Sequence, residues 1–361
     1  MKHIVFLVSG AFKYPGGGAK VILEYAGRLS LDGVKVTMLY SAALFFREAS
    51  LYHKIRMILR YWYNRITGFY TCRSWFKRSG LVEEKWVWSL EQRYAPTADC
   101  YVATSVDTVS FLEAYNISPD KKFYFIQGFE DWIDGFNAKK VLATYHYNIQ
   151  KIVISSWLQE IVEKEGLSCV KVPNGFDFNE FKCVNPTDER NPFSVAMLYN
   201  TNPAKGVEYS FKALEIVKKR YPQLKVNVFG VYPRPSDMPD WYNYYQSPNI
   251  EKLNWIYNNS AVYVATSVNE GWGLTVGEAM ICGCAVVCTN AKGFLEMAED
   301  GKNALVTPIK DAEATANAVI RLIQDNLLRK KLVDNALVSI REYDVEASYM
   351  LFRKTVVNDF E

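Results

Sequence analysis

An apolar, β-branched run ends near Ser267 and is followed by Asn269-Glu270-Gly271-Trp272-Gly273-Leu274-Thr275-Val276-Gly277-Glu278-Ala279-Met280. This pattern predicts a strand, a glycine-containing loop and a helix that begins near Leu274 or Thr275. The first turn of a helix presents unpaired backbone N–H groups and the positive end of the helix dipole. Gly271 and Gly273 let a ligand approach this backbone closely. The segment therefore favours a phosphate site at the carboxyl end of a strand.

The same alternation of strand and helix patterns runs along nearly the whole chain. Segments of helical period, such as residues 19–31, 207–221 and 312–324, separate many of the predicted strands. Strands that alternate with helices form parallel sheets covered on both faces. The fold class is therefore α/β, with two Rossmann-like, doubly wound domains. The predicted strands are 3–9, 34–41, 99–105, 122–127, 151–155, 169–172, 193–199, 224–229, 261–266, 284–289 and 304–307.

A cluster of turn residues, Pro173-Asn174-Gly175-Phe176-Asp177, marks the boundary between the domains. A polar stretch follows it, and the strand pattern restarts at Phe193. We therefore predict a first domain over residues 1–175 and a second domain that starts at residue 176. A (β/α)₈ barrel is the main alternative, but the irregular block at residues 47–78 and the restart at Phe193 count against its eight regular units.

Composition excludes several classes of protein. Hydrophobic residues make up 49% and charged residues 22% of the 361 residues, which is typical of a globular chain and not of a disordered one. No apolar run approaches the ~18–20 residues of a membrane-spanning helix. The run at residues 4–8 is also too short for a signal peptide, so we expect a cytoplasmic protein. The seven cysteines are scattered, so neither a disulfide framework nor a metal site is expected.

Charge is concentrated in one region of the first domain. The net charge is only +3, yet the region from Arg47 to Arg78 holds eight basic residues against a single acid, Glu48. Many aromatic residues lie between these charges. Such a stretch suits an anionic, partly apolar partner, and we predict peripheral contact with a membrane surface. Nucleic acid is a competing partner without a recognition module, and an ordinary amphipathic helix with a solvated basic face is the plainer alternative.

Two carboxylates frame the predicted phosphate site. Glu270 lies in the loop before the helix, and Glu278 lies about one turn inside it. An ionised carboxylate accepts hydrogen bonds from the vicinal hydroxyls of sugars. One acid for a hexose, one for a ribose and backbone amides for a diphosphate describe a nucleotide-sugar site. In the alternative, Glu270 caps the helix and Glu278 is an exposed helical residue.

This segment resembles the E-x₇-E motif of the family 4 glycosyltransferases, which have the two-domain GT-B fold and act with retention. The following text, Glu278-Ala279-Met280-Ile281-Cys282-Gly283-Cys284-Ala285-Val286-Val287, is similar to the family's E-A-M-A-x-G-x-P-V-V. Glu296 and Asp300-Gly301-Lys302-Asn303 resemble its E-x-x-x-D-G-x-N turn. Weaker similarity in other segments points to a rhamnosyltransferase-like branch.

The resemblance implies a role for each matching position. Glu270 would contact the donor sugar, Glu278 would hold the ribose, and Lys205 would neutralise the leaving diphosphate. The diphosphate would contact the backbone of Gly273, Leu274 and Thr275. The loop that holds Gly17 and Gly18 would lie near the diphosphate and the acceptor, although it is not a G-x-G-x-x-G fingerprint. Residues 341–361 would form a helix that packs back on the first domain, which leaves 176–340 as the donor domain.

The chain also departs from the family pattern. Asn200 stands where the family usually has an arginine, and Arg234 and Lys292 are weak candidates for a replacement cation. The histidine that often ends a central strand of the first domain is missing. Glu130 and Asp131 follow that strand and are candidate acceptor-orienting or base residues, unless they form a solvated loop pair.

The combined prediction is a retaining, metal-independent glycosyltransferase without a cofactor. It would transfer a hexose or deoxyhexose from a UDP- or dTDP-linked donor to a lipid-linked or growing glycan, as in bacterial capsule or O-antigen synthesis. It would work in the cytoplasm, at the inner face of the cell membrane. Two alternatives stay open: a catalytically silent sugar-nucleotide-binding subunit and a sugar-nucleotide 2-epimerase.

Overall fold

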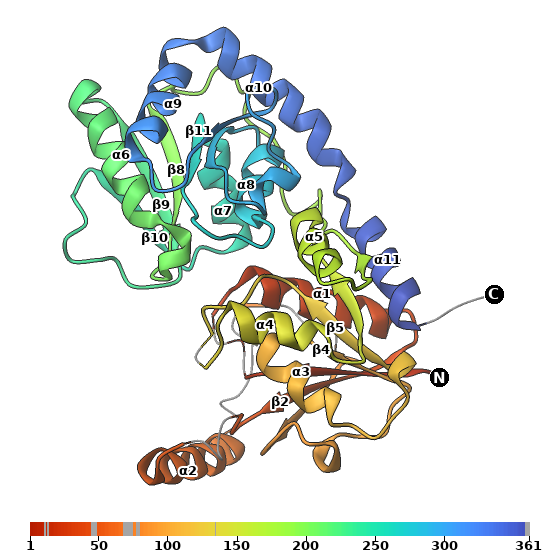
Figure 1. Ribbon diagram of the computed structural model, residues 1–361. Coiled ribbons are helices and arrows are strands. Elements are labelled where there is room, and N and C mark those ends of the chain that lie inside the picture. The colour runs from red at the N-terminus through yellow and green to blue at the C-terminus, as the bar shows by residue number, and fades with distance from the viewer. Residues whose placement is uncertain are drawn as a thin grey trace. The chain divides into compact units, whose positions relative to one another are not determined.

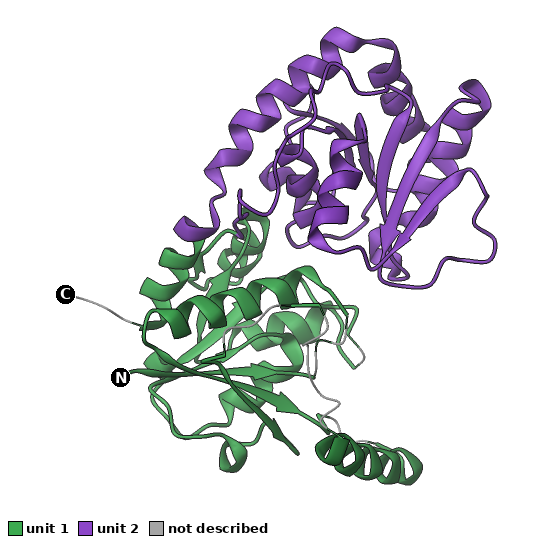
Figure 2. Ribbon diagram, turned by 180° about the vertical axis from the view of Figure 1, so that it is seen from behind, with its two compact units in different colours: residues 1–173, 348–361 green, residues 174–347 purple. Residues whose placement is uncertain are grey.

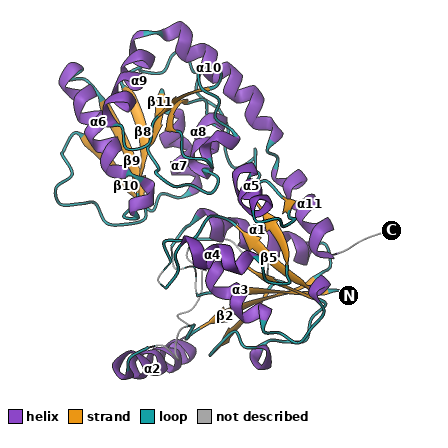
Figure 3. Ribbon diagram, in the orientation of Figure 1, coloured by secondary structure: helices purple, strands orange, loops and turns teal. Residues whose placement is uncertain are grey.

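The computed structural model describes residues 1–10, 12, 14–44, 49–67, 75–76, 80–133 and 135–357. The chain forms two compact units (Figure 2). Unit 1 comprises Met1–Pro173 and Ser348–Glu361, and unit 2 comprises Asn174–Ala347. Each unit is a parallel sheet flanked by helices (Figure 3), so the predicted α/β class with two doubly wound sheets is confirmed.

The sheet of unit 1 has seven parallel strands in the order β3-β2-β1-β4-β5-β6-β7. The interior strand β1 is buried along its whole length, in keeping with its mostly apolar sequence. Its strands are β1 His3–Val8, β2 Lys35–Ser41, β3 Glu83–Val87, β4 Cys100–Ala103, β5 Lys122–Ile126, β6 Gln150–Val153 and β7 Val170–Lys171. Its helices are α1 Gly17–Leu31, α2 Leu51–Thr67, η2 Gln92–Tyr94, α3 Val106–Glu113, η3 Pro119–Lys121, α4 Ala138–Tyr145 and α5 Ser156–Lys164, where η denotes a 3₁₀ helix.

The sheet of unit 2 has six parallel strands in the order β10-β9-β8-β11-β12-β13 (Figure 1). Side chains from β8, β9, β11 and β12 form its core together with α6 and α9. Its strands are β8 Ser194–Tyr199, β9 Lys225–Gly230, β10 Tyr242–Gln246, β11 Val262–Ala265, β12 Ala285–Thr289 and β13 Ala304–Thr307. Its helices are η4 Pro203–Lys205, α6 Val207–Arg220, α7 Ile250–Asn258, α8 Leu274–Ile281, η5 Phe294–Glu296, α9 Ala312–Gln324, α10 Asn326–Ser339 and η6 Ile340–Glu342. The last helix, α11 Val345–Val357, begins in unit 2 and ends in unit 1.

Two strands, β3 and β10, are absent from the sequence prediction. Each is one of the two edge strands of its sheet. The sequences EEKWV and YNYYQ lack the apolar, β-branched run on which the prediction relied, because an edge strand is only half covered. The strands on which both faces are covered match the predicted apolar runs to within a few residues.

The observed boundaries differ slightly from the predicted ones. Unit 2 begins at Asn174 because Phe176 pairs with the end of the same unit: its N–H donates to the Tyr343 carbonyl at 2.9 Å. The last helix begins at Val345, not at Arg341, because the side chain of Asp344 accepts the Glu346 N–H at 2.8 Å and caps a new helix.

The C-terminal half of α11 packs within unit 1. Phe352 is fully buried there and stacks on Phe6 of β1, with ring centroids 6.1 Å apart. It also contacts Tyr25 of α1 at 4.8 Å. On the same helix, Arg353 forms an ion pair with Asp32 at 3.3 Å. Among the described helices none is long and apolar enough to span a bilayer.

Candidate functional site

Lys205 lies at the carboxyl edge of the unit 2 sheet, in the connection between β8 and α6. This connection is pinned to the residues after β11: the Val268 N–H donates to the Ala204 carbonyl at 2.8 Å, and Thr266 Oγ1 donates to the Gly206 carbonyl at 2.8 Å. Gly206 has a φ of 56°, and a Cβ there would lie 2.1 Å from the Thr266 carbonyl oxygen. Only glycine fits at this position. Its close approach to Thr266 and these hydrogen bonds hold the loops after β8 and β11 together.

This contact brings Lys205 and Glu270 together across 65 positions of sequence. Lys205 Nζ donates to Glu270 Oε1 at 2.9 Å and to Oε2 at 2.7 Å. Ser267 Oγ donates to the same Oε2 at 3.1 Å. The two charged side chains are 28% and 14% exposed, so water screens their attraction less than on an open surface. The two predicted catalytic residues thus form one fixed pair.

The predicted diphosphate-binding segment lies beside this pair. Helix α8 begins at Leu274, as expected, and Leu274 and Thr275 occupy its partly exposed first turn. N–H groups in a first turn lack an intrahelical acceptor. Gly273 precedes them with a φ of 101°, and a Cβ there would lie 2.4 Å from Phe294 Cδ1. No side chain caps α8, so the alternative in which Glu270 caps this helix is wrong.

Glu278 lies one turn further along α8 and is buried, with 8% of its surface exposed. The alternative of an exposed helical residue is therefore wrong. Tyr257 of α7 donates its hydroxyl to Glu278 Oε2 at 3.0 Å. Burial and the neighbouring Glu278 carboxylate raise the pKa of Tyr257 well above its ordinary value, so it stays a donor. A buried carboxylate with one oxygen held in this way suits a fixed polar ligand.

A buried arginine, Arg190, connects the C-terminal ends of α7 and α8 through hydrogen bonds to their carbonyl groups. The Arg190 guanidinium is 7% exposed and bridges groups at the ends of both helices. Sequence reasoning missed Arg190, because its partners are mostly backbone carbonyls far along the chain that no motif reveals. It donates to the carbonyls of Tyr257 (3.3 Å), Ser260 (3.2 Å), Cys282 (2.6 Å) and Gly283 (2.9 Å) and to Asn258 Oδ1 (3.2 Å).

Gly17 and Gly18 lie at the carboxyl edge of the unit 1 sheet. Helix α1 begins at Gly17, after β1, and both glycines are exposed. A Cβ at Gly18 would lie 3.2 Å from Oε1 of Gln127, which directly follows β5. That oxygen is buried and accepts no hydrogen bond within the part of the chain that the structure describes. Gln127 therefore offers an unsatisfied acceptor close to the glycine loop.

Glu130 and Asp131, the predicted acceptor-side pair, have different environments. Glu130 Oε2 accepts the Val106 N–H at 2.7 Å, at the start of α3. Burial and, to a lesser extent, the nearby Asp107 carboxylate raise the pKa of Glu130 to about 8, although the hydrogen bond from the Val106 N–H opposes them. Asp131 is exposed. Glu130 therefore has the burial and the raised pKa that suit a proton acceptor near neutral pH, whereas Asp131 faces solvent. In the described ranges no group of three or more His, Cys, Asp or Glu side chains is placed to hold a metal ion.

Residues 180–338 match the family model described as glycosyl transferases group 1. This match lies within unit 2, which is therefore similar to the domain that the family model describes. Among solved structures, Anabaena HepE in complex with UDP and glucose superposes with a TM-score of 0.73 at 16% identity, and the match covers 99% of this chain and 100% of that one. The whole chain therefore has the GT-B fold, as the sequence predicted.

Curated relatives align over a smaller part of the chain. A phosphatidyl-myo-inositol mannosyltransferase of Mycolicibacterium smegmatis is 26% identical over 234 residues, which covers 60% of this chain and 60% of that protein. The capsular polysaccharide biosynthesis glycosyltransferase CapM of Staphylococcus aureus is 24% identical over 254 residues, covering 64% and 66%. The aligned segments span less than two thirds of these relatives.

Unit 2 has no arginine at position 200. Asn200 instead shapes the loop that carries Lys205, because its Oδ1 accepts the Asn202 N–H at 2.8 Å. Arg234 is bound within its own loop, where it donates to the Met238 carbonyl at 3.1 Å. Lys292 is exposed in the loop after β12. Of these two candidates for a second cation, Lys292 is therefore the less constrained.

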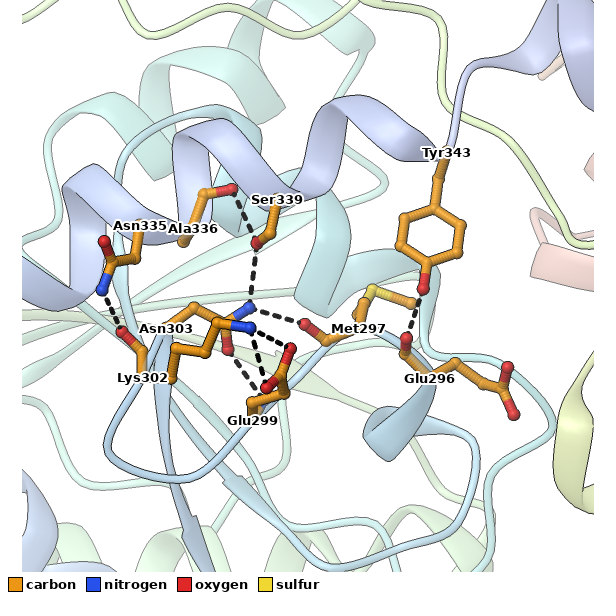
Figure 4. A network of polar contacts seen from close by, with 9 residues as sticks. All are labelled: Glu296, Met297, Glu299, Lys302, Asn303, Asn335, Ala336, Ser339 and Tyr343. Carbon is orange, nitrogen blue, oxygen red and sulfur yellow. Dashed lines mark hydrogen bonds and ion pairs between the residues drawn. The ribbon is translucent and has the colours of Figure 1, made fainter.

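The turn that resembles E-x-x-x-D-G-x-N has a structural role in unit 2 (Figure 4). Asn303 is buried and donates to Met297 and to Ser339 of α10, each at 2.9 Å. Its Oδ1 accepts the Glu299 N–H at 2.7 Å. The Tyr343 hydroxyl donates to the Glu296 carbonyl. These contacts hold the turn in place. They also fix η5, whose Phe294 ring packs against Gly273.

Proposed function

We propose that this chain transfers a hexose or deoxyhexose from a UDP- or dTDP-linked donor to a lipid-linked or growing glycan, with retention and without a metal ion. One observation carries the proposal: the Lys205–Glu270 pair lies at the carboxyl edge of a parallel sheet, next to the glycine-led start of α8. A fixed cation, a fixed carboxylate and free helical N–H groups are what a sugar diphosphate requires.

The donor would bind with its diphosphate at Gly273, Leu274 and Thr275. Lys205 has three N–H donors, so it can hold a phosphate oxygen while it keeps contact with Glu270. It would stabilise the charge that develops on the departing diphosphate. Glu270 would orient the sugar through its hydroxyls. Glu278, whose Oε2 is held by Tyr257, would accept hydrogen bonds from the ribose.

Unit 1 would supply the acceptor side of the reaction. The exposed backbone at Gly17 and Gly18 would contact the diphosphate or the acceptor, and Gln127 Oε1 would accept a hydrogen bond from a hydroxyl. Glu130 would take up the proton of the attacking hydroxyl or orient that hydroxyl, because its raised pKa matches proton uptake near neutral pH. Asp131 would be secondary, since it is exposed to solvent.

The names of the relatives support the proposed acceptor class. Their names include a phosphatidyl-myo-inositol mannosyltransferase and a capsular polysaccharide glycosyltransferase, so we place this chain in bacterial-type surface glycan synthesis, such as capsule or O-antigen. A lipid-linked acceptor calls for a peripheral location at the inner face of the cell membrane, with contact through residues 47–78. Residues 45–48, 68–74 and 77–79 in and next to this region lie outside the described residues.

Incubation with UDP- and dTDP-sugars and a bacterial lipid extract tests the proposal. We expect acceptor-dependent release of the nucleoside diphosphate and a product whose anomeric configuration, measured by NMR, equals that of the donor. An inverted product would contradict retention. Conversion of the donor without acceptor would identify an epimerase instead.

Asn200 in place of an arginine favours one second candidate, a sugar-nucleotide-binding subunit without turnover. This candidate predicts that the chain binds a nucleotide but forms no product from any donor, even when the bacterial lipid extract is present. Retention of both Lys205 and Glu270 in a tight pair argues against it.

A further inference from the structure

Helix α2 attaches to unit 1 through one side only. The crossover between the parallel strands β2 and β3 contains this helix. Its least exposed residues are Lys54, Met57, Tyr61 and Asn64, which recur at helical spacing and so share one face. The Tyr61 ring packs edge-on against Trp88, with centroids 5.4 Å apart. Figure 1 shows α2 at the margin of unit 1.

The opposite side of α2 is a continuous apolar surface, which we call the α2 stripe. At about 100° per residue its members occupy one arc roughly 140° wide, and no polar residue falls inside that arc. Leu59 is 65%, Trp62 56% and Ile66 81% exposed. The stripe consists of Leu51, Tyr52, Ile55, Ile58, Leu59, Trp62, Tyr63 and Ile66, each of them exposed.

Cations border the α2 stripe on both sides. On the helical wheel, Lys54 and Arg65 flank one edge, and Arg56 and Arg60 flank the other. The helix contains no Asp or Glu. A crossover helix in a parallel sheet ordinarily turns its apolar face to the sheet. In α2 the apolar face points away from the unit, so packing within the unit does not explain its composition.

We infer that α2 lies flat in the interface of a bilayer that contains anionic lipids. The stripe inserts among the upper acyl chains, and the exposed flanking cations Arg56, Arg60 and Arg65 lie at the level of the lipid phosphates. Trp62, Tyr52 and Tyr63 suit the boundary between the two. This inference sharpens the proposed peripheral location, but it does not depend on the transfer reaction, because binding is measured without donor or acceptor.

Charge and chemistry favour this partner over two others. A second copy of α2 against the stripe would bring eight cations together without a single acid to offset them, which opposes pairing. A nucleic acid would neutralise the cations but would leave the wide apolar face uncovered. An anionic bilayer would both neutralise the cations of α2 and cover its apolar face.

Flotation of the full chain with vesicles tests the inference. The vesicles consist of phosphatidylcholine with or without phosphatidylglycerol. We expect binding to the anionic vesicles and at least a tenfold loss of binding in L59E/I66E, because two exposed apolar side chains no longer enter the bilayer. The matched control is L327E/V338E in α10, which makes the same change at two exposed positions of unit 2 and should bind as the parent does.

A charge variant separates the two contributions. R56Q/R60Q keeps the α2 stripe and should bind anionic vesicles only at lower salt than the parent. Circular dichroism melts verify that each variant is folded. The inference is overturned if the parent chain binds neither kind of vesicle, if L59E/I66E binds as the parent does, or if the parent is a dimer that L59E/I66E dissociates. Preference for a single-stranded oligonucleotide over anionic vesicles would also overturn it.

Discussion

The carboxyl edges of the two sheets are built differently. In unit 2 the charged groups are already paired: Lys205 holds both oxygens of Glu270, and Tyr257 holds Glu278. In unit 1 Gln127 keeps a buried acceptor without a partner among the described residues, and burial raises the pKa of Glu130 to about 8.

The two sheet edges thus differ in whether their polar groups are already paired before a ligand binds. Groups fixed in advance cost no reorganisation when charge develops during a reaction, which suits a ligand of constant chemistry such as a nucleoside diphosphate. Polar groups left available suit a ligand that differs between related enzymes, such as the acceptor. We therefore expect substitutions in unit 2 to have large, uniform effects and substitutions in unit 1 to have smaller effects that depend on pH.

The largest effect should follow Lys205→Ala. Loss of a charge that stabilises the leaving diphosphate should lower the transfer rate about 10²–10³-fold. Nucleotide affinity should change less, since the N–H groups of α8 remain. Steady-state kinetics and nucleotide titration measure the two quantities. Lys212→Ala, at an exposed lysine of the next helix, is the control. A rate within a few-fold of the parent would show that the Lys205–Glu270 pair is only structural.

Arg190→Met should produce the largest loss of stability. Several buried carbonyl groups at the ends of α7 and α8 would lose their donor, and we expect the free energy of unfolding to fall by about 3 kcal/mol or more. Urea unfolding measures it. Arg234→Met changes a partly exposed arginine and should cost less than about 0.5 kcal/mol. Equal losses in the two variants would refute the role of Arg190 as the support behind Glu278.

Gly273→Ala should have an intermediate effect. A left-handed residue other than glycine costs about 1–2 kcal/mol, and the new Cβ would also press on Phe294 at 2.4 Å. Gly301→Ala separates the two causes, because Gly301 has a φ of 68° but nothing within 4 Å of its Cβ. Thermal melts of both should show the larger loss at Gly273. A smaller loss at Gly273 than at Gly301 would contradict the close packing of this loop.

The smallest effect concerns Glu130 and pH. Its pKa is raised to about 8, so the folded state favours the protonated form. The corresponding stability is full below the ordinary glutamate pKa and is lost as pH rises through about 8. Glu130→Gln should therefore flatten the decline of melting temperature between pH 5 and pH 9, and it should do so more than Asp131→Asn, a change at the exposed neighbouring position. An identical decline in the parent and in Glu130→Gln would contradict the burial of this carboxyl group.

The sequence predicted those features that depend on local pattern. Buried strands such as β1 and β12 are mostly apolar, and the start of α8 follows from its glycines. The edge strands β3 and β10 escaped because their sequences, EEKWV and YNYYQ, are rich in polar residues and hold no apolar, β-branched run.

The rest of the site depends on contacts across long stretches of sequence. The pairing of Lys205 with Glu270 joins residues 65 positions apart, and only the resemblance to a family placed them in one site. Tyr257 and Arg190 belong to no motif and could not be assigned. The direction of the α2 stripe was equally hidden, because periodicity shows that a helix is amphipathic but not which face meets the protein.

Thermal stabilisation by nucleotides tests most directly whether unit 2 is built for a sugar diphosphate. UDP, dTDP and GDP are added separately to the parent chain, to Glu278→Ala and to Glu313→Ala, a control at an exposed position of α9. A nucleotide at 100 times its dissociation constant should add about 2.7 kcal/mol of stability. We predict a clear shift with UDP or dTDP in the parent and in Glu313→Ala, and a much weaker one in Glu278→Ala. No shift with any of the three nucleotides, or an equal shift in Glu278→Ala, would contradict the donor site.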